Sequence, residues 1–133
     1  MIRNKILGLI VSALTLASSA SAQQYNGPIF DVIHIDVMPQ YIAEAVFALD
    51  KYRDETLTED GASSCKVLQE AGRSNHFTIE EEWARQSDYD AHISNDHARR
   101  FRDKIQPLLG APIDERLHTE LPPTLQGETR RRR

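Results

Sequence analysis

The order of its predicted elements places this chain in the α+β class, as a ferredoxin-like split βαβ fold. Apolar residues alternate with a period of two in four short segments, and they recur every three or four residues in two longer ones. The segments follow one another as strand, helix, strand, strand, helix, strand, the order in which two helices cover one face of a four-stranded antiparallel sheet. Together they span about residues 29–121, a length that suits one domain with a single core.

The first strand is predicted over Ile29 to Met38, a run rich in β-branched residues that stops at Pro39. Its period of two divides the side chains between two faces: Ile33, Ile35 and Val37 on one, and Phe30, Val32, His34, Asp36 and Met38 on the other. Because both faces carry apolar residues, we expect both to be at least partly covered.

An amphipathic helix is predicted from Pro39, a residue suited to a first helical turn, to about Leu57. Its buried stripe is expected to hold the residues that recur at helical spacing, namely Ile42, Ala45, Val46, Leu49 and Arg53. A turn at residues 59–61 then leads into a second strand, predicted over Ser63 to Glu70.

A hairpin connection at residues 71–75 leads into a third strand, predicted over residues 76–83. The side chains that share one face of this strand are Phe77, Ile79, Glu81 and Trp83. An acidic residue thus points the same way as three large apolar ones.

A second helix is predicted to start near Ser87, because Ser87 and Asp90 have the spacing in which a hydroxyl caps exposed backbone amides. Its apolar stripe is expected to hold Tyr89, Ile93, His97, Phe101, Ile105 and Leu108. Poor helix formers at 94–96 interrupt the pattern, so a short helix that turns into a longer one is the alternative to one continuous helix. A last strand is predicted over Asp114 to Leu121.

The sheet face away from the helices has no cover within the predicted fold. A large exposed apolar sheet face is rare in a soluble monomer, so we expect a second copy of the chain to pack there. The sequence thus predicts a homodimer with this face at or near the interface.

Residues 1–22 have the pattern of a secretory signal peptide: Arg3 and Lys5 precede an apolar run, and small residues end at Ala22. The run is too short to span a bilayer, which takes about 20 residues, so no stable membrane anchor is expected. We expect cleavage after Ala22 and an exported, periplasmic or secreted protein. Residues 23–28 are then a linker and 122–133 a disordered basic tail.

Without the first 22 residues the chain has 14 Lys and Arg against 20 Asp and Glu, and this acidic balance argues against nucleic acid as a partner. The Arg130 to Arg133 run is expected to be solvated. Cys65 is the single cysteine, so no internal disulfide can form. We expect it to be a buried apolar residue and not a nucleophile.

From Glu81-Glu82-Trp83, eight residues lead to His92 and four more to His97, with Phe101 and Pro107-Leu108-Leu109 beyond. In these residues the chain resembles the antibiotic biosynthesis monooxygenase (ABM) family, close to its quinol monooxygenase-like members. The resemblance implies a dimeric α+β barrel, in which two such sheets meet and each subunit holds a pocket between its sheet and its helices. It also implies oxygenation of a quinol or small aromatic substrate by dioxygen without flavin, metal or nicotinamide, hence no cofactor.

In such chemistry the substrate itself reduces dioxygen, which is easier from its deprotonated form, so the site needs a base and a dry pocket. We expect His92 and His97 to be the catalytic bases, because the unperturbed pKa of histidine lies near working pH. Glu81 is expected to orient a histidine or hold a proton. The expected substrate-binding side chains are Trp83, Tyr89, His34 and Phe101.

Each of these residues also has a purely structural interpretation. Trp83 at a strand end can simply pack, and His97 lies on the apolar stripe as a satisfied core histidine would. His92 can bond a neighbouring turn, and His34 can lie at the surface or at an interface. Glu81 can pair with an arginine, for which Arg99 and Arg100 are the candidates.

A metal site is not expected, because His92 and His97 diverge by roughly 140° around a regular helix unless the helix breaks at Ser94. Haem degradation is disfavoured because the asparagine and the second tryptophan that haem-degrading relatives use are missing. The sequence therefore favours a cofactor-independent monooxygenase. The alternative is a dimer that binds a small ligand without catalysis.

Overall fold

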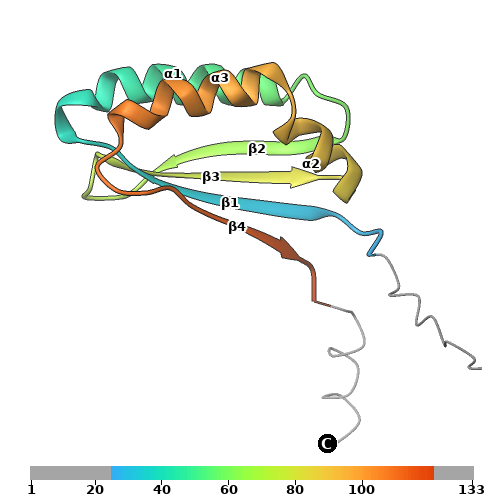
Figure 1. The fold of residues 1–133 in the computed structure, drawn as a ribbon. Helices are drawn as coiled ribbons and strands as arrows, with labels where there is room; N and C mark the ends of the chain where they lie inside the picture. Colours follow the sequence, from blue (N-terminus) through green and yellow to red (C-terminus); the bar gives the residue numbers. More distant parts are fainter. Residues whose placement is uncertain (1–24, 122–133) are drawn as a thin grey trace, which may run out of the picture.

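The structure is a computed structural model that describes residues 25–121, and it has the predicted α+β architecture. Figure 1 shows the helices on one face of a four-stranded sheet. The elements in chain order are β1 (Ile29–Asp36), the short 3-10 turn η1 (Pro39–Tyr41), α1 (Ile42–Thr56), β2 (Ala62–Gln69), β3 (His76–Trp83), α2 (Gln86–Ile93), α3 (Asp96–Ile105), the 3-10 turn η2 (Gln106–Leu108) and β4 (Asp114–Thr119). The strand order is β2-β3-β1-β4 with all neighbours antiparallel, which confirms the ferredoxin-like arrangement.

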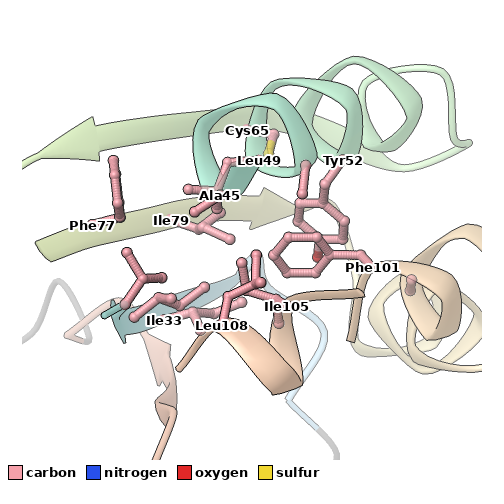
Figure 2. Close-up of a cluster of buried hydrophobic side chains, with 14 residues drawn as sticks. Ile33, Ala45, Leu49, Tyr52, Cys65, Phe77, Ile79, Phe101, Ile105 and Leu108 are labelled. Carbon is pink, nitrogen blue, oxygen red and sulfur yellow. The ribbon is translucent and has the colours of Figure 1, made fainter. Parts of the chain in front are cut away.

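The odd-numbered residues of β1 face the helices, as the period of two predicts. Ile33 is at most 3% exposed, and it stands between Ile79 on β3 and Glu115 on β4 in the sheet register. Figure 2 shows Ile33 and Ile79 in the apolar layer beneath Leu49 of α1. This layer is the main core. A second, smaller apolar cluster of Ile29, Trp83 and Tyr89 lies where β1 begins and β3 ends.

Helix α1 buries a stripe that differs from the predicted one. Its buried residues are Ala45, Ala48, Leu49, Tyr52 and Thr56. Val46 is 38% exposed, and Arg53 bonds Asp50 and Asp54 on the outer surface, so their assignment to the stripe was wrong. The true stripe follows the 3.6-residue repeat with small or polar side chains, and it carries Tyr52 into the interior.

The helical region after β3 breaks in two, as the polar residues at 94–96 allowed. Helix α2 begins at Gln86 with Arg85 as its N-cap, so Ser87 lies inside the first turn and the predicted cap at Ser87 was wrong. Helix α3 has a true side-chain cap, because Asn95 Oδ1 accepts a hydrogen bond from the backbone N–H of His97 at 3.4 Å. The break lets α2 and α3 each turn a histidine inward.

The opposite face of the sheet has no helix on it (Figure 1). Its apolar side chains include Phe30 and Val32, which are half-buried, and Leu68, which is 46% exposed. Within residues 25–121 no helix is long and apolar enough to cross a membrane. The predicted signal peptide and basic tail lie outside the described residues.

Candidate active site

A buried carboxylate, Glu81, lies at the centre of the candidate site. It is 2% exposed, and its strand position on β3 points it toward the helices together with Trp83. The Tyr52 hydroxyl donates to Glu81 Oε1 at 2.5 Å, and the indole N–H of Trp83 donates to Oε2 at 3.0 Å. Burying a carboxylate costs free energy unless hydrogen bonds replace its water, and these two donors do so.

Tyr52 links this carboxylate to His92. Its hydroxyl oxygen lies 2.8 Å from His92 Nε2. Burial, and then the charge and hydrogen bond of Glu81, raise the pKa of Tyr52, so its single proton stays on the oxygen and points to Glu81. The oxygen must then accept from Nε2–H, which assigns His92 the tautomer with its proton on Nε2.

The other nitrogen of His92 faces a second carboxylate, Glu59, from the turn after α1. His92 Nδ1 lies 2.7 Å from Glu59 Oε1, and His97 Nε2 lies 2.9 Å from the same oxygen. Thr56 Oγ1 is 3.4 Å from that His97 nitrogen. Glu81, Tyr52, His92, Glu59 and His97 thus form one continuous chain of polar contacts, hereafter the relay.

A second buried acid, Asp31, lies directly opposite Glu81 in the β1–β3 register. Burial raises the pKa of Asp31 to about 8, and the hydrogen bond to Glu115 and the charges of Glu115 and Glu81 add to the rise. Burial alone would raise the pKa of Glu115, but the hydrogen bonds and charge of Arg102 outweigh it and lower that pKa. At neutral pH Asp31 therefore keeps its proton and donates it to ionised Glu115, which Arg102 also holds at 2.7 and 2.9 Å.

A groove between α1 and α3 reaches the relay from the outer surface. It encloses about 480 Å³, and its deeper residues are Ala48, Tyr52, His97 and Phe101. The Tyr52 and Phe101 rings stack with centroids 4.2 Å apart, and Figure 2 shows them side by side. Charged side chains form its rim: Lys51, Glu55, Arg100, Asp103 and Lys104. This hollow lies between the two helices, whereas the resemblance implies a pocket between the sheet and the helices. A smaller hollow of about 160 Å³ lies between α1 and the strands β2 and β3.

Most of the residues predicted for the site come together. Glu81, His92 and His97 belong to the relay, and the Trp83 ring lies over His92 with centroids 4.6 Å apart. Phe101 lies in the groove, against Tyr52. Tyr89 is buried beside Trp83, but its hydroxyl turns toward Glu115 at 3.4 Å.

His34 does not join this group, because it lies exposed on the opposite face of the sheet, where it contacts Thr78. Neither proposed arginine pairs with Glu81: Arg99 bonds Asp96, and Arg100 lies 3.8 Å from Glu55. Cys65 is buried, and burial together with the charge of Glu81 raises the pKa of its thiol to about 12, which agrees with an inert apolar role.

Three residues of the site were missed in the sequence. The burial of Tyr52 could have been predicted, since the spacing from Ala45 through Ala48 to Tyr52 is helical. The burial of Asp31 could also have been predicted, because its odd number places it on the buried face of β1. The position of Glu59 could not, because a turn gives no periodicity from which the direction of a side chain follows.

Glu59, His92 and His97 also form a group able to hold a metal ion, since one ligand atom from each lies within 4.8 Å of the others. The expectation of no metal rested on the divergence of the two histidines around one helix. The break at Ser94 removes that argument, because it brings both rings to one carboxylate oxygen.

The fold and this arrangement define a small α+β protein of the ferredoxin-like class, with an acid–tyrosine–histidine relay. Residues 28–104 match the sequence model of the family described as antibiotic biosynthesis monooxygenase (ABM). This match covers more than half of the chain, and the protein belongs to that family.

Solved structures with the same fold include a conserved protein from Methanosarcina mazei Go1, 24% identical with a TM-score of 0.69, covering 72% of this chain and 95% of that one. Another, from Nitrosomonas europaea, is provisionally assigned as an antibiotic biosynthesis monooxygenase; it is 18% identical with a TM-score of 0.67, covering 71% and 99%. A third, from Bacteroides thetaiotaomicron, carries the description of a possible oxidoreductase; it is 21% identical with a TM-score of 0.66, covering 71% and 98%. No curated protein matches the chain.

Proposed function

We propose that this protein is a monooxygenase that oxidises a quinol or another small phenolic substrate with dioxygen. The observation that carries the proposal is that two members of the relay, His97 and Tyr52, line the α1–α3 groove. Family membership supports the reaction class. The flat pair of Tyr52 and Phe101 supports an aromatic substrate, because stacked aromatic rings favour a third ring against them.

His97 acts as the base in this proposal. A phenolic hydroxyl in the groove loses its proton to His97, and the carboxylate of Glu59 behind the ring stabilises the imidazolium that forms. The resulting phenolate is the electron donor to dioxygen. For a benzene-1,4-diol, one oxygen atom enters the ring and the other leaves as water, so the diol and dioxygen give a hydroxyquinone and water without an outside reductant.

The test is oxygen uptake by the purified protein with menadiol and a panel of related quinols, measured above the uncatalysed rate. We expect uptake, and we expect His97→Gln to lower kcat/KM by about 100-fold or more, the usual contribution of a positioned base. His76→Gln is the matched control, because His76 lies at the opposite end of β3 from Trp83 and binds Asp36. No uptake with any quinol would contradict the proposal, and ligand binding without uptake would favour the non-catalytic alternative.

We further propose that the active form is an exported homodimer joined through the sheet face that no helix covers. Half-buried Phe30 and Val32 and exposed Leu68 on that face support it, because a partner would remove them from water. In such a dimer the α1–α3 groove stays open, since it lies on the other side of the sheet. Sedimentation as a stable monomer at micromolar concentration would refute the dimer.

A further inference from the structure

We infer that Glu59, His92 and His97 form a binding site for a divalent transition-metal ion of the zinc type. The inference does not depend on the proposed oxygenase activity. It rests on the distances between these three side chains, on the hydrogen bonds around them and on their burial.

The hydrogen bonds of the relay leave one contact without a hydrogen atom. Glu81 accepts a hydrogen bond from the only hydroxyl proton of Tyr52 at 2.5 Å, and the Tyr52 oxygen accepts one from the Nε2–H of His92. With its proton on Nε2, His92 presents the Nδ1 lone pair to a carboxylate oxygen of Glu59 at 2.7 Å. Two acceptors at this distance repel each other, so a proton or a metal ion belongs between them.

Buried negative charge also favours a cation at this site. Glu59 and Glu81 are largely or fully buried, with side chains 13% and 0% exposed. Among the ion pairs of residues 25–121, both carboxylates have only histidine partners and no lysine or arginine. Tyr52 and Trp83 donate hydrogen bonds to Glu81, but the contacts of Glu59 are the two imidazoles, so a divalent ion would compensate the largely buried Glu59 carboxylate.

The distances between the three ligand atoms are close to those of a tetrahedral site. Tetrahedral ligands on zinc, at about 2.1 Å from the ion, stand about 3.4 Å apart. The two contacts to Glu59 Oε1 are 2.7 and 2.9 Å, so an ion requires them to open by about 0.5 to 0.7 Å, while the two histidine nitrogens already lie within 4.8 Å of each other. Two imidazoles and one carboxylate, with a further position for water, are the ligand set of many catalytic zinc sites, and they disfavour calcium and magnesium.

The surroundings of the site also match those of metal ligands. A metal-bound histidine usually donates its second N–H to an oxygen that fixes the ring, and His92 does so to Tyr52, which Glu81 anchors. The α1–α3 groove reaches His97 and offers a path from solvent. The histidine at the end of this path is thus both a ligand and the side chain that an entering ion meets.

The experiment uses tag-free, chelator-treated full-length protein titrated with Co²⁺, followed by displacement with Zn²⁺. We expect one equivalent of Co²⁺ per chain, with a visible d–d spectrum that Zn²⁺ abolishes and that excess Ca²⁺ or Mg²⁺ leaves unchanged. Zn²⁺ should also raise the Tm of the wild-type protein, because a ligand that binds only the folded state stabilises it. Absence of saturable binding, or binding that Ca²⁺ removes, would overturn the inference.

Variants identify the ligands. Glu59→Gln and His97→Gln should lose the spectrum and the Tm shift, whereas Tyr52→Phe should weaken binding by about 10- to 100-fold, as expected for a group that orients a ligand. His97→Cys should keep binding and add a sulfur-to-cobalt charge-transfer band, a readout that a merely structural His97 would not give.

His76→Gln is the matched control, because His76 Nδ1 also faces two carboxylates, Asp36 at 2.5 Å and Glu70 at 3.7 Å, but with Arg73 against its other nitrogen. This variant should bind as the wild type does. If His76→Gln abolishes binding while His97→Gln retains it, the site lies elsewhere and the inference is wrong.

Discussion

Replacing Asp31 by asparagine should stabilise the protein at neutral and alkaline pH. Asp31 is 1% exposed, and burial, the hydrogen bond to Glu115 and the nearby charges of Glu115 and Glu81 raise its pKa from 3.8 to about 8. Its Oδ1 also has no hydrogen-bond partner among the described residues. An asparagine has the same shape, donates to Glu115 as the protonated acid does, and never ionises.

The direction of the pH dependence follows from the different proton affinity of Asp31 in the folded and unfolded states. The unfolded chain releases the Asp31 proton near pH 4, and the folded protein holds it to about pH 8, so rising pH favours the unfolded state across this window. The stability that Asp31 contributes is fully present below about pH 4 and is lost by pH 8. Between pH 3.8 and pH 7 this loss amounts to roughly 4 kcal/mol, at 1.36 kcal/mol per pH unit.

Part of this gain is offset, because an amide N–H is a weaker donor than the carboxylic O–H of Asp31, whose hydrogen bond helps to lower the pKa of Glu115. We therefore expect Asp31→Asn to raise the free energy of unfolding by about 2 kcal/mol at pH 7, roughly half of the full linkage value. The difference between variant and wild type should be near zero at pH 4, grow up to pH 8 and stay constant above it.

Urea unfolding at several pH values, followed by the fluorescence of buried Trp83, the single tryptophan, measures this difference. Asp114→Asn is the control, since Arg116 lowers the pKa of Asp114 and the change at this exposed site should be small and of opposite sign. A difference that does not vary with pH, or a variant less stable than the wild type at pH 8, would refute the reasoning.

Two further predictions concern backbone and thiol. Gly61 and Gly72 both have positive φ, 82° and 84°, but a Cβ at Gly61 would lie 2.3 Å from Asp88 Cγ, whereas nothing lies within 4 Å of one at Gly72. Gly72→Ala should lower the free energy of unfolding by about 1–2 kcal/mol, because of the left-handed conformation alone. Gly61→Ala should lower it by clearly more, because the clash with Asp88 is added. Equal losses of stability in thermal melts of the two variants would contradict the steric argument. Cys65 should resist a thiol reagent until urea unfolds the chain, because burial raises the pKa of its thiol to about 12, and rapid modification of the native protein would show that the side chain is accessible.

The sheet and its order could be predicted from the sequence because the strands obey a period of two. β3, for example, has the predicted bounds, His76–Trp83. The phase of α1 was mispredicted because its buried stripe contains alanine, tyrosine and threonine, which are weak markers of burial, while exposed Val46 is a strong one. Apolar character alone therefore points to the wrong face of that helix.

The site could be predicted only in part for a related reason. Glu81 and Trp83 follow from strand alternation, but their partner Tyr52 comes from the helix whose buried face was mispredicted. Glu59 lies in a turn, where the direction of a side chain depends on the path of the whole loop and not on a repeat.

The break between α2 and α3 shows that packing and chemistry are not alternatives in this protein. On one continuous helix His92 and His97 would diverge by about 140°, and only one could lie against Glu59. Asn95 allows both histidines to do so, because it caps a new helix at the residue where the chain must turn. The same turn completes the core, since α3 then packs Phe101 against Tyr52. The residues that make the helix break therefore also bring two imidazole nitrogens to one carboxylate oxygen, where they share a proton or hold a metal ion.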